Sequence, residues 1–154
     1  MGEKVIVENR RARHDYHVLD TVEAGIVLTG TEAKSLRMQS SMTLKDSYAD
    51  IRGGELFLLG AHIPPYERGN IYNHDPERDR KLLLHRGEIL KLGQRVAEKG
   101  LTMVPLRVYY KKGIVKVLIG VCRGKHSYDK RTAIKEKESK REMDRAIRQF
   151  QKEK

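Results

Sequence analysis

The alternation of apolar and polar positions along the first part of the chain predicts strands joined by tight turns. The stretch YHVLDTVEAGIVLTG, Tyr16 to Gly30, is rich in β-branched residues, with a break at Glu23-Ala24-Gly25 that is either a hairpin turn or a bulge. The stretch LKDSYADIRGGELFLLGAHI gives two runs around Gly53-Gly54, a strong hairpin signal. Pro64-Pro65 ends the second run, because proline cannot donate to a strand ladder.

The last apolar stretch, LTMVPLRVYYKKGIVKVLIGVC, predicts another hairpin, around Lys111-Lys112-Gly113. In its second strand the apolar residues alternate and share one face, which leaves Lys116 pointing the other way. These apolar residues are Val115, Val117, Ile119 and Val121.

Three segments carry helical signals. TEAKSLRM opens with Thr31 as a possible cap. RGEILKLGQRVAEKG has apolar residues at i, i+3 and i+7, and Gly100 stands where a C-cap glycine belongs. Asp75-Pro76-Glu77 has the pattern of a helix start: a capping aspartate, a proline at the first position and a glutamate.

Short strands, flanking helices and a glycine hairpin within about 120 residues predict a mainly β fold. We expect residues 1–123 to form a small closed β-barrel of the oligonucleotide-binding type.

Residues 124–154 have a different composition. They hold 11 Lys or Arg and 6 Asp or Glu, and few apolar side chains. Met143, Ile147 and Phe150 would form only a narrow helical stripe, too little to offset the entropy lost on ordering in water. We expect a basic tail that is disordered alone and helical against a partner; the alternative is a solvated tail that aids solubility.

The formal net charge of +11 is shared by both parts of the chain, which points to a polyanionic partner and above all to nucleic acid.

The single cysteine, Cys122, excludes an internal disulfide and lies in an apolar run typical of a buried thiol. The N-terminus lacks the apolar core of a signal peptide, and no window is apolar enough to span a membrane. These features predict a soluble, cytoplasmic protein.

The sequence contains no phosphate-binding loop, nucleophile elbow or dinucleotide fingerprint, so we expect no enzyme and no cofactor. His14 and His17 flank Asp15, but the neighbouring arginines would repel a metal ion, so no metal site is expected either. A nuclease that uses Asp15 and Asp75 with nearby histidines is the enzymatic alternative.

Basic residues gather around aromatic ones in two places. NRRARHDY holds Arg10, Arg11 and Arg13 before Tyr16, and GKHSYDKR surrounds Tyr128 with basic residues. Such spacing suits phosphate contacts beside a stacked base. RNA binding is the function that these clusters favour.

Six blocks in unbroken order between Asn9 and Arg131 resemble the small protein B family, the bacterial transfer-messenger RNA (tmRNA) binding factors. The blocks are NRRARHDY, EAGIVLTGTEAKSLR, LKDSYADI, GELFLLGAHIPPYERGN, NHDPERDRKLLLH and GKHSYDKR. The resemblance implies an oligonucleotide-binding-like barrel that binds the tRNA-like domain of tmRNA. It also implies delivery, with elongation factor Tu and GTP, to stalled ribosomes in trans-translation, and no chemistry by the protein itself.

The resemblance also implies particular residues. Glu23, Leu83 and Lys116 match positions that the family uses to bind tmRNA, and Asn9 and His85 match neighbouring ones. With Arg11 and Arg13 from the first basic cluster they form the predicted RNA-binding set. From the residues alone, Glu23 could instead be an exposed turn carboxylate and Leu83 a core residue.

The family's tail enters the vacant mRNA channel of the ribosome near the decoding centre in 16S rRNA. The matching residues here are Gly124, Lys125, His126, Tyr128, Asp129, Lys130 and Arg131. His126 stands where the family usually has lysine, and Tyr128 where a ring is thought to stack on a base. A general RNA-binding or ribosome-assembly protein is the alternative function.

Overall fold

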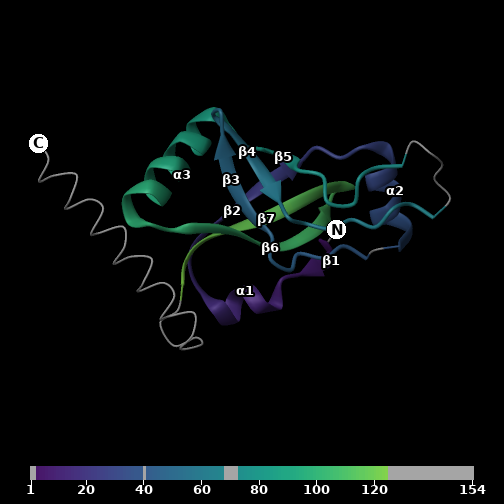
Figure 1. The fold of residues 1–154 in the computed structure, drawn as a ribbon, viewed down its shortest axis with the longest axis horizontal. Helices are drawn as coiled ribbons and strands as arrows, with labels where there is room; N and C mark the ends of the chain where they lie inside the picture. Colours follow the sequence, from purple (N-terminus) through teal and green to yellow (C-terminus); the bar gives the residue numbers. More distant parts are fainter. Residues whose placement is uncertain (1–2, 40, 68–72, 125–154) are drawn as a thin grey trace, which may run out of the picture. The chain divides into compact units, whose positions relative to one another are not determined.

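Seven strands and three helices make up the described part of this computed structural model, residues 3–39, 41–67 and 73–124 (Figure 1). In chain order they are β1 (Lys4–Glu8), α1 (Arg10–Asp15), β2 (Tyr16–Ile26), α2 (Gly30–Gln39), β3 (Tyr48–Arg52), β4 (Glu55–Leu59), β5 (Arg80–Leu83), α3 (Arg86–Lys99), β6 (Thr102–Lys111) and β7 (Ile114–Gly124).

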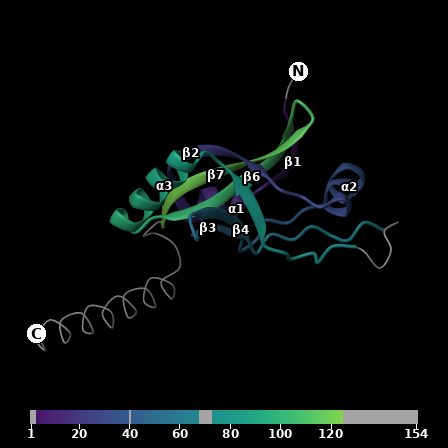
Figure 2. The same cartoon turned by 90° about the horizontal axis from the view of Figure 1, so that it is seen from above.

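The strands form one antiparallel sheet in the order β1-β6-β3-β4-β5-β2-β7, and β7 pairs again with β6. Six strands therefore close into a barrel. β1 and β3 share one edge of β6, where β1 pairs with Arg107–Tyr110 and β3 with Met103. α2 and α3 lie toward opposite ends of the strands (Figure 2). The predicted mainly β barrel with flanking helices is confirmed.

Both predicted hairpins are confirmed, and the reason is local. Gly53 and Gly54 have φ of +60° and +77°, and Lys112 and Gly113 have φ of +52° and +77°. Two successive residues with positive φ make the turn whose twist matches that of paired strands, and glycine adopts this conformation without a steric penalty.

The predicted break at Glu23-Ala24-Gly25 is wrong. β2 is continuous through these residues, which pair in unbroken register with Leu118, Val117 and Lys116 of β7. The irregularity lies earlier, between Val18 and Asp20, where the register shifts. Pairing of all three residues with β7, and of Gly25 with β5 as well, therefore overrides the weak strand propensity of the Glu-Ala-Gly sequence.

Two predicted helix starts need correction. Thr29, not Thr31, caps α2: its Oγ1 accepts from the N–H of Glu32 at 3.3 Å, and its own N–H donates to the Glu32 carboxylate at 2.8 Å. Pro76 and Glu77 form a turn in place of a helix, in which the Asp75 carboxylate accepts from the N–H of Glu77 at 3.0 Å. A side chain thus caps each segment, but the cap of α2 lies two residues earlier than predicted, and Asp75 stabilises only a turn.

The second run of the first hairpin ends before the prolines. β4 stops at Leu59, and Gly60 follows with φ +77°. A Cβ at Gly60 would lie 3.2 Å from the carbonyl oxygen of Asp46. Close backbone approach at this glycine, rather than Pro64-Pro65, therefore ends the strand.

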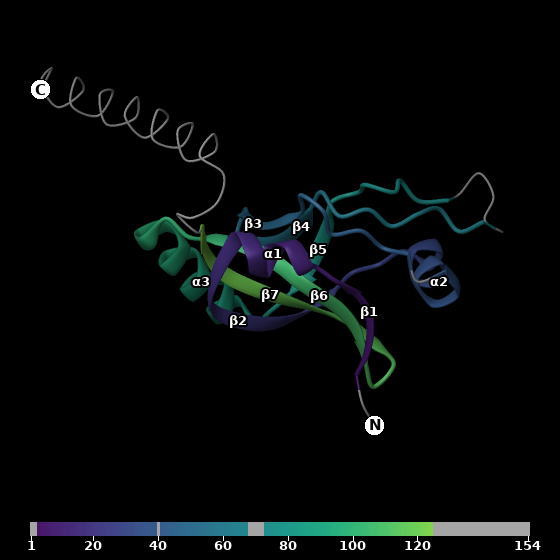
Figure 3. The same cartoon turned by 90° about the horizontal axis from the view of Figure 1, so that it is seen from below.

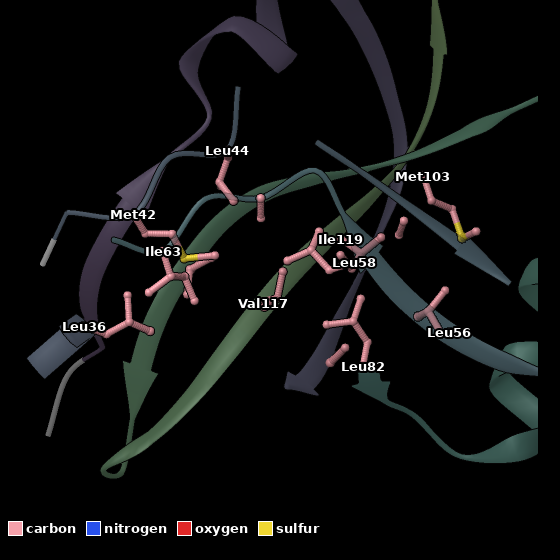
Figure 4. Close-up of a cluster of buried hydrophobic side chains, with 14 of the residues drawn as sticks. Leu36, Met42, Leu44, Leu56, Leu58, Ile63, Leu82, Met103, Val117 and Ile119 are labelled. Carbon is pink, nitrogen blue, oxygen red and sulfur yellow. The ribbon is translucent and has the colours of Figure 1, made fainter. Parts of the chain in front are cut away.

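α3 is confirmed as predicted, with Gly100 in the left-handed conformation at its C-terminus. The main core fills the barrel and extends toward α2 (Figure 4). Its labelled side chains are Leu36, Met42, Leu44, Leu56, Leu58, Ile63, Leu82, Met103, Val117 and Ile119.

One buried ionic cluster ties α2 to the barrel. Glu32 and Arg80 are both 0% exposed, and Nε of Arg80 donates to Oε2 of Glu32 at 2.6 Å. Arg78 donates to Oε1 at 2.6 Å, and Arg80 also donates to the carbonyl oxygens of Ala61 and Pro76. Each charge in the cluster is thus paired and hydrogen-bonded, as buried charges must be.

Gly120, in β7, has little room for a side chain. A Cβ there would lie 2.9 Å from Cδ1 of the buried Leu106 and 3.1 Å from Sγ of Cys122. Gly120→Ala should therefore lower the free energy of unfolding by about 1–3 kcal/mol through overpacking. Gly87→Ala is the matched control, because a Cβ in α3 at Gly87 meets nothing within 4 Å. Urea unfolding measures both; equal stabilities would contradict the packing argument.

Candidate RNA-binding site

Glu23, Leu83 and Lys116 lie on one outer face of the barrel, on three neighbouring strands. Gly25 of β2 pairs with Leu83 of β5 on one side and with Lys116 of β7 on the other. Cross-strand partners share a face, and Glu23, two residues before Gly25, shares it as well. The intervening residues point into the core: Ala24, Leu82 and Val117. We call the surface of Glu23, Gly25, Leu83, Tyr109 and Lys116 the outer face.

Leu83 is half exposed, at 50%, whereas its neighbour Leu82 is 1% exposed. The core-packing alternative for Leu83 is therefore wrong. A Cβ at Gly25 would lie 3.3 Å from Cβ of Leu83, so the leucine rests against bare backbone of β2. This arrangement presents an apolar side chain to solvent at a fixed position.

Glu23 lies within a strand rather than in a turn, so the exposed-turn alternative is also wrong. Its Oε2 accepts a short hydrogen bond from the Tyr109 hydroxyl, and Nζ of Lys111 lies 3.3–3.4 Å from both carboxylate oxygens. The Tyr109 bond, opposed by desolvation and helped by Lys111 and Lys116, lowers the pKa of Glu23. The carboxylate is thus ionised and flanked by lysines, which offset its repulsion of phosphate.

Tyr109 supports the outer face from below. It is 1% exposed, pairs with Lys116 and Val5, and carries the Arg107 guanidinium 5.1 Å from its ring centroid. Burial and the hydrogen bond to Glu23 raise the pKa of its hydroxyl. The phenol therefore remains a protonated donor at physiological pH.

α1 packs on the same side of the sheet, over β6 and β7 (Figure 3). Ala12 packs with Val104, Leu106 and Cys122, and Leu118 packs against this cluster. Leu118 is also the cross-strand partner of Glu23. The arginine-bearing helix therefore borders the outer face, so the structure brings the two groups of predicted residues to one side of the barrel.

The individual residues of α1 have structural partners. Asn9 caps the helix, since its Oδ1 accepts from the N–H of Ala12 at 3.2 Å, and its Nδ2 donates to the carbonyl oxygen of Pro105 at 2.9 Å. Arg11 lies 3.5 Å from Asp15 and is largely exposed, and Arg13 is close enough to Cys122 to influence its thiol. Asn9 therefore positions the helix, while the Arg11 guanidinium faces solvent.

A hollow of about 760 Å³ lies beside α1, between Asn9, Arg11 and the loop from Met42 to Ser47. Its charged lining residues balance in sign: Glu8, Asp15 and Asp46 against Arg10, Arg11 and Lys45. It lacks the excess positive charge of a phosphate-binding groove.

His85 is exposed just before α3, two residues beyond Leu83, and its N–H donates to the Glu88 carboxylate at 3.2 Å. A smaller hollow, about 320 Å³, lies beside it, lined by Leu83, Lys81, Arg86 and the Gly53-Gly54 turn. His85 thus flanks the outer face from the side of β5.

Gly124, predicted as the first tail residue, is the last residue of β7 and pairs with Tyr16 of β2. The other predicted tail residues lie outside the described residues: Lys125, His126, Tyr128, Asp129, Lys130 and Arg131.

No group of three or more His, Cys, Asp or Glu side chains is arranged to hold a metal ion within residues 3–39, 41–67 and 73–124. Over the same ranges, no helix has both the length and the apolar character needed to cross a membrane. Cys122 is fully buried, as predicted, and burial raises the pKa of its thiol to about 11, which leaves little reactive thiolate near neutral pH.

Comparison with known proteins decides the family. The family described as "SmpB protein" matches residues 6–149 of this chain. The chain belongs to the SmpB family. SmpB is the short form of small protein B, so the resemblance predicted from the six sequence blocks is confirmed.

Relatives within the SmpB family share more than half of their residues with the chain. The "SsrA-binding protein" of Staphylococcus haemolyticus is 57% identical over 143 residues, which cover 93% of this chain and 91% of the relative. That of Acetivibrio thermocellus is 54% identical over 146 residues, covering 95% and 94%. A solved chain from "tmRNA-SmpB: a journey to the center of the bacterial ribosome" is 49% identical with a TM-score of 0.66, covering 83% of this chain and 93% of that one.

Sequence reasoning missed two residues that contact Glu23: Tyr109, on the outer face, and Lys111, whose ammonium pairs with the Glu23 carboxylate. Tyr109 reads as one of several apolar residues in a strand, and it lies 86 residues from Glu23. Only the alternation of β6, once its register with β7 is known, places its hydroxyl on the outer face.

Proposed function

We propose that this protein binds the tRNA-like domain of tmRNA through the outer face of its barrel and delivers it to stalled ribosomes in trans-translation. The supporting observation is the convergence of Glu23, Leu83 and Lys116 around Gly25, in a chain whose relatives are SsrA-binding proteins.

Each residue of the outer face suits a different part of RNA. Lys116 supplies a cation for a phosphate, the half-exposed Leu83 an apolar surface for a sugar or a splayed base, and Glu23 an acceptor for a 2′-hydroxyl or a base amino group. Arg11 and Arg13 on α1, with Asn9 as its cap, and His85 beyond β5 extend the contact on two sides.

Residues 125–154 act on the ribosome in this proposal. A channel lined by 16S rRNA is a long negative groove, and mRNA in it excludes a second chain. A tail with 11 basic residues that becomes helical only in a vacant channel detects stalling directly. Lys125 to Arg131, including His126, reach the decoding centre, and the stripe of Met143, Ile147 and Phe150 is buried there.

Elongation factor Tu with GTP joins through tmRNA rather than through this protein. The protein performs no chemistry of its own, and its place of action is the cytoplasm, where ribosomes translate.

Competition with bulk tRNA tests the proposed function. The full-length protein should bind the isolated tRNA-like domain at least tenfold more tightly than bulk tRNA at the same salt, since specific binding exceeds the electrostatic background by far more than this. Similar affinities for the two would favour a general RNA-binding or ribosome-assembly protein instead.

Lys116→Ala should weaken binding to the tRNA-like domain and reduce the slope of log K against log salt by about 1, because one phosphate contact is lost. Lys91→Ala, on the exposed side of α3, is the control and should change neither. Binding measured by fluorescence anisotropy from low to moderate salt gives both values. An unchanged slope for Lys116→Ala would remove this lysine from the phosphate contacts.

A further inference from the structure

The hydrogen bond between Tyr109 and Glu23 crosses a whole strand. Tyr109 belongs to β6 and Glu23 to β2, and β7 lies between these two strands. Within β7, Lys116 pairs with Tyr109 and Leu118 pairs with Glu23. The ring is buried, but its hydroxyl reaches the carboxylate of a residue whose side chain is 32% exposed. The bond therefore joins the wall of the barrel to the surface where RNA would bind.

Because of this bond, the two carboxylate oxygens of Glu23 have different hydrogen-bond partners. Oε2 accepts from the Tyr109 hydroxyl and lies 3.3 Å from Nζ of Lys111. Oε1 has only the long 3.4 Å contact with Lys111 among the described residues. Since an ionised carboxylate oxygen can accept two hydrogen bonds, Oε1 keeps accepting capacity.

The direction of the bond is also fixed. The pKa of Glu23 is lowered, with the Tyr109 bond as the largest cause, and burial with the same bond raises the pKa of Tyr109. The phenol is thus always the donor and the carboxylate always the acceptor near neutral pH.

We infer that Tyr109 is a positioning residue for RNA recognition: its hydroxyl holds Oε2 of Glu23 so that Oε1 accepts a hydrogen bond from an RNA donor, a ribose 2′-hydroxyl or a base amino group. This inference rests on the proposed function. A carboxylate free to rotate would lose entropy on binding and could turn Oε1 toward Lys116 instead, so fixing it beforehand raises affinity.

A double-mutant cycle tests the inference in the full-length protein with the isolated tRNA-like domain. Tyr109→Phe removes only the hydroxyl and should weaken binding about three- to tenfold, the range of one lost hydrogen bond. Glu23→Gln should weaken it at least as much. Because Tyr109 acts through Glu23, the double variant should bind no more weakly than Glu23→Gln alone.

Tyr110→Phe is the matched control: it makes the same chemical change one residue further along β6, on the opposite face. It should leave RNA affinity unchanged. Thermal unfolding of each variant separates binding from stability, because a merely structural hydroxyl would alter stability and give additive losses in the cycle.

The outcomes separate this inference from the proposed function. If Lys116→Ala and Glu23→Gln weaken binding but Tyr109→Phe does not, the positioning role of Tyr109 is wrong, and the outer face remains the RNA-binding site. The same conclusion follows if the affinity losses of Tyr109→Phe and Glu23→Gln add in the double variant. If none of the three weakens binding, the proposed site is wrong as well. Single 2′-deoxy substitutions along the RNA identify the donor. If one substitution makes the Glu23→Gln variant and the wild type bind with equal affinity, the donor is the 2′-hydroxyl at that position. If no substitution does so, the donor is a base amino group.

Discussion

Removal of residues 125–154 is expected to abolish tagging on stalled ribosomes while leaving affinity for the tRNA-like domain within about twofold, since the proposed contacts with this domain all lie between Asn9 and Lys116. The cut is placed after Gly124 because this residue still pairs with Tyr16 in the sheet. Reconstituted translation on an mRNA without a stop codon measures tagging, and anisotropy measures affinity.

A shuffled tail is the matched control for this truncation. Shuffling residues 132–154 keeps the charge but destroys the spacing of Met143, Ile147 and Phe150, so tagging should fall sharply although RNA affinity does not. Full tagging with the shuffled tail would mean that the tail is only a nonspecific anchor. Loss of RNA affinity on truncation would show that the barrel and tail do not divide the work as proposed.

Glu32→Gln is expected to lower the free energy of unfolding by about 3–5 kcal/mol at pH 7, because it leaves the charge of the fully buried Arg80 uncompensated. This is a large part of the stability of an ordinary domain. Glu55→Gln is the matched control: its ion pair with Lys81, at 3.1 Å, is exposed, so the loss should stay below about 1 kcal/mol.

The pH dependence of stability provides a second readout for Glu32. Burial opposes ionisation of this carboxyl, but hydrogen bonds from Arg78, the N–H of Thr29 and Arg80 outweigh it, so its pKa is lowered. The pair's stabilisation is fully present above the unfolded pKa, about 4.3, and is lost as pH falls through the folded pKa. The difference in the free energy of unfolding between wild type and Glu32→Gln should therefore become smaller in acid. Urea unfolding from pH 7 to pH 3 measures it; a constant difference would contradict the ionic role of Glu32.

Features set by short-range sequence were predicted well. Gly53-Gly54 and Lys112-Gly113 determine their hairpins through backbone conformation alone, and the apolar spacing of α3 with Gly100 determines that helix. α1 was missed because six residues with three arginines show no helical periodicity. It is held by the Asn9 cap and by the packing of Ala12.

Features that depend on long-range pairing could not be predicted from local sequence patterns. Glu23-Ala24-Gly25 has the composition of a break, and only the pairing of these residues with β7, and of Gly25 with β5, makes the strand continuous. Glu32 reads as a favourable first-turn charge, and its burial against Arg80, 48 residues away, appears only in the fold. The family resemblance named Glu23, Leu83 and Lys116, but their shared face depends on strand register, which no local pattern specifies.

Amide chemical-shift mapping of the full-length protein with the isolated tRNA-like domain shows directly whether RNA binds at the outer face. The largest shifts should fall on β2 around Glu23–Gly25, on Leu83 and on β7 around Lys116, with smaller ones along α1 and little change on the exposed side of α3. Shifts concentrated on α3 or around Gly53-Gly54, with the residues around Gly25 unmoved, would contradict RNA binding at this face.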